Sequence, residues 1–498
     1  MGIIFRQSFK NTLIIYLGFL IGGINTIFLY TRFLKSDYYG LVQFVFSASN
    51  LIMPLIALGI HFTIVKFFSS YTDKVQRDKF LSSVLFLPLF VAIPIAFGWN
   101  YIHEFLIDYI SKSNQDIAIE DYTLYIYVIA ICCAYFEVFY SWAKVQLQTV
   151  FGNVLKELYN RVITMLLLIA VFLGVITKQQ FIPVITGFYV LRTLLMLGYA
   201  SKLYLPKFSL SLPDNYKEVL RYSLYIFLAG SAGAIILDID KFMIPGKETF
   251  SKAAYYTVAV FLGSFIEAPS RAMTQILQPM TSKSINENNS DEVKSLYKKS
   301  SINLLLVGGL FFTLINTNVK ELFKIMPDRG YADGLLVVLF ISLAKLVTMT
   351  LGNNGAIINN SRFYRISLPL GVFMALSVYF LNKYFYFTLN MGTEGLALAT
   401  LITILLSSLF KVFFVRGKFK MQPFTGKTVL LGFLILMFYL GFNFWDFSVP
   451  KFSIGNVPID PLVNIILKSI LIIPLYVGLV YQLKISEQIN TLISRFVR

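Results

Sequence analysis

Apolar stretches recur along the whole chain, and short polar segments separate them. A helix needs about 20 mostly apolar residues to cross about 30 Å of hydrocarbon. Splitting the chain at its polar breaks predicts fourteen such spans, and the pattern therefore predicts an all-α polytopic membrane protein. The expected limits are 9–32, 39–68, 80–100, 121–146, 157–177, 180–204, 217–240, 252–281, 301–322, 334–358, 364–384, 394–414, 427–446 and 460–482.

The polar segments alternate in charge, which predicts an orientation. If the N-terminus is cytoplasmic, the inward segments hold 27 Lys and Arg against 9 Asp and Glu, and the outward segments hold 12 against 15. Cytoplasmic loops of membrane proteins are enriched in Lys and Arg. We therefore expect both termini in the cytoplasm. The same bias accounts for the net charge of +17, together with attraction to anionic lipid heads, and no loop is large enough to bind nucleic acid.

Composition supports a membrane protein. Hydrophobic residues make up 57% of the chain and charged residues only 14%, whereas about 25% is usual in soluble proteins. The first apolar stretch is too long for a signal-peptide core, so we interpret it as the first span. The adjacent Cys132 and Cys133 lie in an apolar run and are expected to be small buried side chains.

Two segments of the chain resemble each other, 31–55 and 240–270. Each has a basic residue followed by Phe at the outer end of a span, then a polar turn, a Tyr pair and a proline inside an unusually long span. The matching positions are Arg32 and Lys241, Tyr38-Tyr39 and Tyr255-Tyr256, and Pro54 and Pro269. Because six spans separate the copies, the repeat predicts two parallel six-helix lobes. The expected domains are an N-terminal lobe (1–205), a C-terminal lobe (206–422) and two extra helices with a tail (423–498).

Outside the polar loop segments, six formal charges remain. Each costs about 2.5–3.5 kcal/mol at a helix centre, so these side chains should face protein or water. Glu267 and Arg271 are four residues apart and share one helix face. Pro269 lies between them and predicts a bend there. The six residues are Glu137, Arg192, Glu267, Arg271, Lys345 and Lys468.

Most of these residues allow both a structural and a functional interpretation. Glu267 and Arg271 form either a structural ion pair or the charged wall of a cavity. Lys345 either snorkels to the interface or contacts a diphosphate or sugar acids. Glu137 either pairs in the interior, with Lys144 on a similar face, or couples transport to protons. His61 either titrates near neutral pH or is hydrogen-bonded inside the bundle.

The stretches "RQSFKNTLIIYLGFLIGGINTIFLYTRFLKSDYYGLVQFVFS" and "LDIDKFMI…AAYYTVAVF" resemble the multidrug/oligosaccharidyl-lipid/polysaccharide exporter superfamily, and within it the polysaccharide-transport (Wzx-like) oligosaccharide flippases. This resemblance implies an alternating-access machine that moves an undecaprenyl-diphosphate-linked oligosaccharide from the cytoplasmic to the periplasmic leaflet. It also implies a central cavity lined by the first, second, seventh and eighth spans.

The resemblance, together with the charges inside the spans, gives the expected site. The diphosphate and sugar are expected to meet Arg32, Lys241, Arg271, Lys345, Asn25 and His61. A coupling proton or sodium ion is expected at Glu267, Asp238, Asp240 or Glu137. The expected partners are the lipid-linked oligosaccharide, membrane lipids and polysaccharide polymerase or export proteins. The chain is expected to act as a monomer in the bacterial cytoplasmic membrane.

Enzyme signatures are missing from the sequence. The stretch "QPFTGKT" ends like a phosphate-binding loop but has Met421 where the first glycine is required. With two histidines, no HExxH and no CxxC pair, the chain offers few ligands for a metal, and we expect no cofactor. Alternatives within the superfamily are a lipid II flippase and a drug/cation antiporter. A membrane-embedded glycan polymerase or glycosyltransferase fits less well, because the longest outward loop has only about 20 residues.

Overall fold

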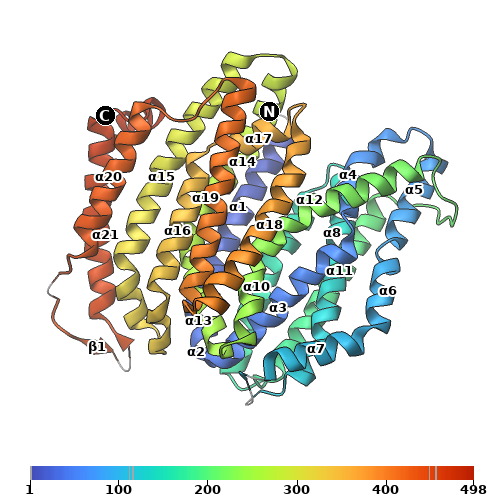
Figure 1. The fold of residues 1–498 in the computed structure, drawn as a ribbon, viewed down its shortest axis with the longest axis horizontal. Helices are drawn as coiled ribbons and strands as arrows, with labels where there is room; N and C mark the ends of the chain where they lie inside the picture. The colour runs from blue at the N-terminus through green and yellow to red at the C-terminus, as the bar shows by residue number, and fades with distance from the viewer. Residues whose placement is uncertain (1–2, 112, 115–116, 448, 455–456, 498) are drawn as a thin grey trace. The chain divides into compact units, whose positions relative to one another are not determined.

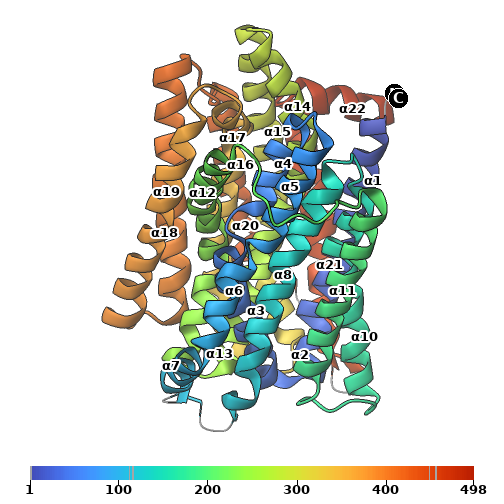
Figure 2. The same cartoon turned by 90° about the vertical axis from the view of Figure 1, so that its right-hand side faces the viewer.

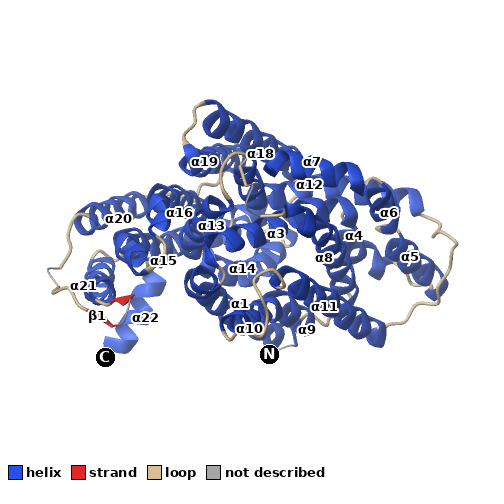
Figure 3. Cartoon of the chain, turned by 90° about the horizontal axis from the view of Figure 1, so that it is seen from below, coloured by secondary structure: helices blue, strands red, loops and turns tan. Residues whose placement is uncertain are grey.

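The computed structural model describes residues 3–111, 113–114, 117–447, 449–454 and 457–497. Most of these residues are helical (Figures 1 and 3). Within the described part of the chain, the strands are β1 (Ser453–Ile454) and β2 (Val457–Pro458), which pair antiparallel. The predicted all-α class is confirmed.

Eleven helical segments of the described residues are long and apolar enough to cross a membrane. They are Leu13–Phe33, Lys35–Ala57, Lys74–Phe97, Ile119–Lys144, Phe181–Leu203, Ser290–Ile325, Arg329–Thr350, Tyr364–Thr388, Gly392–Phe419, Gly426–Asn443 and Asp460–Gln482. Each corresponds to one predicted span. The three remaining predicted spans, 157–177, 217–240 and 252–281, are also largely helical. The total of fourteen and the position of the termini stay predictions.

The helices form two compact units. The first unit is Met1–Thr257 with Leu368–Tyr379, and the second is Val258–Ser367 with Phe380–Arg498. Two helices, α13 (Phe250–Ser264) and α18 (Ser367–Asn382), are divided between them. These units are defined by packing, whereas the predicted domains 1–205, 206–422 and 423–498 follow the sequence repeat and stay a prediction.

The first unit contains most of the helices from the N-terminus to α12. Helix α8 packs against α3 and α11, and α12 packs against α3 and α4 (Figure 2). Its elements are α1 (Ile3–Ile24), η1 (Asn25–Leu29), α2 (Tyr30–Phe33), α3 (Lys35–Ala57), α4 (Ile60–Phe67), η2 (Phe68–Ser70), α5 (Lys74–Phe86), α6 (Leu89–Phe97), α7 (Trp99–Ser111), η3 (Ile119–Tyr122), α8 (Thr123–Lys144), α9 (Val150–Asn153), η4 (Val154–Tyr159), α10 (Asn160–Phe172), α11 (Phe181–Leu203), α12 (Tyr216–Met243) and η5 (Ile244–Gly246).

The second unit is arranged around α15. This helix packs against α14, α16, α20 and α21 (Figure 1). The elements are η6 (Phe265–Glu267), α14 (Ala268–Asn286), α15 (Ser290–Ile325), η7 (Arg329–Gly334), α16 (Leu335–Thr350), α17 (Asn354–Asn359), η8 (Tyr364–Ile366), η9 (Lys383–Thr388), α19 (Gly392–Phe419), α20 (Gly426–Asn443), α21 (Asp460–Gln482) and α22 (Glu487–Val497).

Small residues let the central helix of the first unit approach its neighbours. On α8, Ala130, Ala134 and Ser141 are buried, and the neighbouring Trp142 is buried as well. Lipid tails are as apolar as leucine, so association of helices in a bilayer depends on close packing rather than on a hydrophobic driving force. The small side chains supply that close approach, and Trp142 fills the space beside them.

Both spans that carry a repeat-related proline are broken near it. Helix α3 contains Pro54 and ends at Ala57, and Leu58 and Gly59 then adopt positive φ of 45° and 70° before α4 begins. A Cβ on Gly59 would lie 2.7 Å from Ile226 of α12, so this position requires glycine for its backbone and its packing.

The second break lies in the predicted eighth span. Helix α13 ends at Ser264, the 3₁₀ turn η6 follows, and α14 begins at Ala268 with Pro269 in its first turn. Proline is tolerated there because its missing N–H would have no partner in the first turn of a helix. The predicted interruption at Pro269 is confirmed.

Replacing Gly40 by alanine is expected to destabilise the protein. A Cβ at Gly40 in α3 would lie 1.7 Å from the carbonyl oxygen of Phe250, at the start of α13. Forcing extra atoms into a packed interior costs about 1–3 kcal/mol, so the melting temperature should fall. Gly187→Ala in α11 is the matched control, since nothing lies within 4 Å of its added Cβ. A melting temperature equally unchanged in both variants would contradict the close contact.

Candidate functional site

The second unit holds a cluster of charges at the break between α13 and α14. Glu267 is the last residue of η6, and its Oε2 lies 2.6 Å from Nζ of Lys345 on α16. The two side chains are 24% and 15% exposed, so the pair lies inside the helical packing and yet remains reachable by a small ligand. This pair could not be predicted from sequence spacing, because 78 residues separate its partners.

Arg271 completes this group, which we call the Glu267 cluster (Glu267, Arg271 and Lys345). Arg271 lies one turn beyond Glu267 on α14, is exposed, and interacts electrostatically with the Glu267 carboxylate. Two cations against one anion leave the cluster with one excess positive charge. A partly desolvated positive charge of this kind attracts a phosphate or another anion more strongly than an exposed lysine does.

The first unit holds a second group, the Asp238 cluster (Asp238, Ser47, Asn50 and Lys241). Asn50 Nδ2 donates to Asp238 Oδ2 at 3.1 Å, and Ser47 Oγ donates to Oδ1 at 3.4 Å. Lys241 Nζ lies 3.4 Å from the same Oδ1. These contacts join α12 to the middle of α3. The carboxylate, hydroxyl and amide oxygens of the cluster are ligands of the kind that a small hard cation prefers.

Asp240 has a different environment from Asp238, although both are on α12. Asp240 is buried and accepts a hydrogen bond from the hydroxyl of Tyr256 on α13, which is also buried. Burial of both partners makes a structural hydrogen bond between α12 and α13. Of the two carboxylates proposed for ion coupling, Asp238 therefore has the more open polar surroundings.

Glu137 forms the third charged group, in the first unit. Its Oε1 lies 2.5 Å from Nζ of Lys156, which belongs to η4. The sequence pointed to Lys144 as the partner; in the structure Lys144 and His61 also act electrostatically on Glu137, but Lys156 makes the ion pair. Lys156 lies one residue before the predicted fifth span, so it is not among the charges predicted to lie inside the membrane.

Three predicted residues lie apart from these ion pairs. Asn25, in the π-helical turn η1, is buried, and its Nδ2 donates to the carbonyl of Arg161 at 2.8 Å. Arg32 is exposed in the last turn of α2. His61 lies beside Phe62, with ring centroids 4.1 Å apart. Within the described part of the chain, Nδ1 of His61 is buried and has no hydrogen-bond partner.

Arg192 and Lys468, two further charges inside the spans, both have compensating contacts, which lower the cost of a charge in the membrane. Arg192 is buried, with its guanidinium carbon 4.2 Å from the Phe136 ring centroid and its Nη2 3.5 Å from Cys133 Sγ. A cation over an aromatic face is favoured when both are desolvated. Lys468 is buried and lies 2.5 Å from Asp446 Oδ1, so it reaches a carboxylate rather than extending to lipid heads.

Among the described residues, no group of three or more His, Cys, Asp and Glu side chains comes together in a way that could hold a metal ion. The Asp238 cluster has one carboxylate, which already contacts Lys241, and a single carboxylate suits a proton or a monovalent ion better than a divalent metal.

A family model described as polysaccharide biosynthesis protein matches residues 6–268, more than half of the chain. The chain belongs to the polysaccharide biosynthesis protein family. The region that the family model matches includes the Asp238 cluster, Glu137 and Glu267; Arg271 and Lys345 lie beyond its end at residue 268. A search of curated proteins finds no match.

Solved structures share the fold of this polysaccharide biosynthesis protein. A lipid II flippase MurJ in an inward closed conformation is 14% identical with a TM-score of 0.67, and the match covers 96% of this chain and 99% of that one. An inward-facing MATE-family multidrug resistance transporter is 16% identical with a TM-score of 0.63 over 83% and 98% of the two chains. A transporter of the MOP superfamily from Pyrococcus furiosus is 14% identical with a TM-score of 0.54, and the match covers 84% of this chain and 95% of that one.

These similarities are similarities of fold. They show that the chain has the fold of these flippase and transporter structures, as the resemblance implied, and the eleven candidate spans support a multi-pass membrane protein. The three structures do not assign a substrate to this chain.

Proposed function

We propose that this chain is a flippase that moves an undecaprenyl-diphosphate-linked oligosaccharide from the cytoplasmic to the periplasmic leaflet by alternating access. The bacterial cytoplasmic membrane is its proposed location. Transport rather than catalysis is proposed because the family acts in polysaccharide biosynthesis and the shared fold is that of flippases and transporters. Polysaccharide polymerase and export proteins are the proposed partners of a monomeric chain.

The Glu267 cluster is the observation that supports this proposal most directly. A diphosphate headgroup cannot cross hydrocarbon unaided, because an isolated charge there is prohibitive. Arg271 and Lys345 offer two cations within the membrane-spanning part of the second unit, and Glu267 neutralises only one of them. The group is therefore able to replace the water around a diphosphate, while the long tail stays in lipid.

The membrane potential adds to the driving force. A negative charge that moves outward across an inside-negative membrane moves in the favourable direction, and it releases about 2.3 kcal/mol of free energy per 100 mV. A diphosphate substrate carries charge of this sign. Part of the free energy for export is thus electrical, and a coupling ion at Asp238 supplies the rest.

The proposal is tested by removing the chain from cells that make a surface polysaccharide. Surface polymer should disappear, and the lipid-linked oligosaccharide should accumulate in the inner leaflet, where added enzymes that modify its sugars reach it only after the membrane is opened. Restoring the wild-type chain should reverse both effects. Normal amounts of polymer without the chain would refute the proposal.

A lipid II flippase is the second candidate, because the similarity to MurJ covers 96% of the chain while the transporter matches cover 83–84%. The deletion separates the two candidates. Loss of a lipid II flippase stops cell-wall synthesis and lyses cells, whereas loss of an oligosaccharide flippase removes only surface polymer. Lysis on depletion, with the wall precursor accumulating, would favour the second candidate.

The coupling role of Asp238 gives a further prediction. Asp238→Asn keeps the hydrogen-bond acceptor for Asn50 but removes the charge, so transport should become several-fold slower and lose its dependence on a proton or sodium gradient. The measurement is export of a fluorescent lipid-linked sugar from vesicles with an imposed gradient. Asp240→Asn is the matched control, because the amide oxygen still accepts the hydrogen bond from Tyr256. Equal, gradient-dependent transport in both variants would contradict the assignment.

A further inference from the structure

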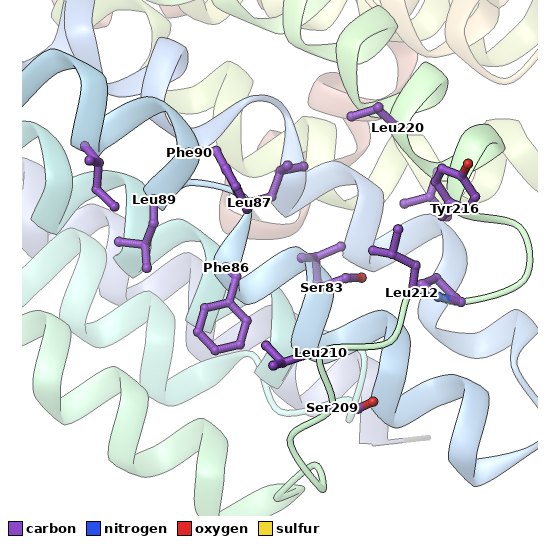
Figure 4. A pocket seen from close by; sticks show the side chains of 14 residues that line it. Ser83, Phe86, Leu87, Leu89, Phe90, Ser209, Leu210, Leu212, Tyr216 and Leu220 are labelled. Carbon is purple, nitrogen blue, oxygen red and sulfur yellow. The ribbon is translucent and has the colours of Figure 1, made fainter.

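An apolar groove in the first unit belongs to none of the charged clusters. Its volume is about 540 Å³. One wall comes from the end of α5 and the start of α6, and the other comes from the segment 204–215 and the first turns of α12 (Figure 4). The lining is almost wholly leucine, phenylalanine, valine and isoleucine; Ser83, Ser209 and Tyr216 are its polar members.

The wall formed by the segment 204–215, which we call the linker, is fixed in place. Tyr204 donates to Asp78 Oδ1 at 2.6 Å, and the backbone N–H of Ser209 donates to Ser82 Oγ at 3.2 Å. Asp214 exchanges two hydrogen bonds with Gln76, at 2.9 and 3.2 Å. This network ties the non-helical linker to α5, so the groove is a built feature and not a gap beside a loose loop.

A further bond holds the end of the linker. Tyr71 donates to Asn215 Oδ1 at 2.5 Å, and burial raises the pKa of the Tyr71 hydroxyl, which therefore stays protonated and able to donate. Tyr71 in turn accepts from Arg77 through its carbonyl, at 2.6 Å. The linker thus connects to α5 at both of its ends.

The linker presents apolar side chains outward, which shows what medium surrounds the groove. Leu210 is 95% exposed and Phe90 across the groove is 74% exposed. Large apolar patches of this kind are rare on surfaces that face water. The groove therefore faces lipid, at the end of the spans where the charge bias predicts the cytoplasmic leaflet.

Size and charge indicate one kind of occupant. The groove is about 540 Å³ and open on one side, a size that suits one fatty-acyl chain better than a whole 55-carbon tail. Exposed Lys207, Lys217 and Arg221 lie on the linker and the first turns of α12, against Asp214 and Glu218. The excess of basic residues suits an anionic headgroup.

We infer that this groove binds one acyl chain of an anionic phospholipid of the cytoplasmic leaflet, with the headgroup phosphate at Lys217 and Arg221. Acyl chains are as apolar as the groove, so the tail alone gains little from leaving the bilayer. Headgroup charge and close packing decide the binding. The bound lipid contacts α5, α6 and the linker together and so stabilises the docked linker. This inference does not depend on which molecule the chain transports.

The test is native mass spectrometry of the purified full chain in detergent, with phosphatidylglycerol or phosphatidylcholine carrying identical acyl chains added in turn. Wild-type protein should retain one more molecule of phosphatidylglycerol than Leu210→Asp, which places a charge in the groove at a position where no packing is lost. Leu147→Asp is the matched control, because Leu147 is 70% exposed in another loop and does not line the groove. It should retain as much lipid as the wild type.

A second variant tests the headgroup. Lys217→Gln with Arg221→Gln should keep the bound chain and lose the preference for phosphatidylglycerol over phosphatidylcholine. Equal lipid retention by the wild type and Leu210→Asp would overturn the site. Displacement of phosphatidylglycerol by undecaprenyl phosphate at equal concentration would overturn the phospholipid assignment and make the groove a site for the polyprenyl tail.

Discussion

Replacing Lys345 by glutamine is expected to reduce export of lipid-linked oligosaccharide to background and to destabilise the protein. The substitution removes the ion pair with Glu267 and leaves that carboxylate with Arg271 as the nearby cation. An uncompensated polar or charged group in a buried position costs about 1–3 kcal/mol. The charge of the cluster also changes from one excess positive charge to none, so it loses its attraction for a diphosphate. Surface polymer and melting temperature are the two measurements.

The double variant Lys345→Gln with Glu267→Gln separates stability from transport. Two amides can hydrogen-bond to each other where the ion pair was, so the melting temperature should recover. Export should recover only in part: the excess positive charge returns on Arg271, but the second cation that the diphosphate is proposed to meet, Lys345, is still missing. Lys283→Gln is the control: Lys283 pairs with Glu287 on the exposed surface of α14, and its loss should change neither measurement. Wild-type export by the double variant would exclude Lys345 from the transport path.

Replacing Glu137 by glutamine should give the largest loss of stability among the charge substitutions. Glu137 is the carboxylate that acts on Lys156, Lys144 and His61 in the first unit. Removing it leaves Lys156 and Lys144 without this anion, and because the Lys156 side chain is 43% exposed, the cost is that of a partly buried charged group losing its partner, about 1–3 kcal/mol. The melting temperature of the purified chain should fall accordingly, and less protein should reach the membrane.

The companion variant Lys156→Gln makes the comparison specific. Glu137 then keeps the electrostatic contact with Lys144, so the loss should be smaller than in Glu137→Gln. Glu287→Gln, at the exposed pair on α14, controls for the substitution itself. A larger fall in melting temperature for Lys156→Gln than for Glu137→Gln would contradict this account. It would show that Lys144 does not share the Glu137 carboxylate and that Glu137 and Lys156 form an isolated ion pair.

The helical spans were predictable because the physics that places them is local. In hydrocarbon a helix must satisfy its own backbone hydrogen bonds, so each span needs one continuous apolar segment. The eleven segments are long and apolar enough for this, and such a run of consecutive residues is visible in the sequence. The break at Pro269 was predictable for the same reason. The break at Leu58–Gly59 was not, because two residues with positive φ end α3 there and only packing against α12 explains why glycine is needed.

The candidate site was predictable in its residues and not in its pairs. A charge within an apolar run is visible in the sequence, which is how Glu137, Glu267 and Lys345 were found. Their partners lie 19 to 188 residues away in the pairs Lys156–Glu137, Lys345–Glu267 and Asn50–Asp238. Ser47, Asn50 and Tyr256 are ordinary polar residues of helices, so nothing in their own spacing marks them. Their roles arise only when α3, α12 and α13 come together.

The contacts of α21 have a consequence for how the second unit is made. Tyr476 of α21 donates to the carbonyl of Leu306, and Lys468 donates to the carbonyl of Thr317, both on α15. Asn318 of α15 likewise donates to Ser469. Since α21 is the last of the eleven candidate spans to be synthesised, α15 is made more than 130 residues before these donors exist. The polar side chains of α21 therefore find their partners on a helix that is already complete, and assembly of this unit ends only when the last span docks on α15.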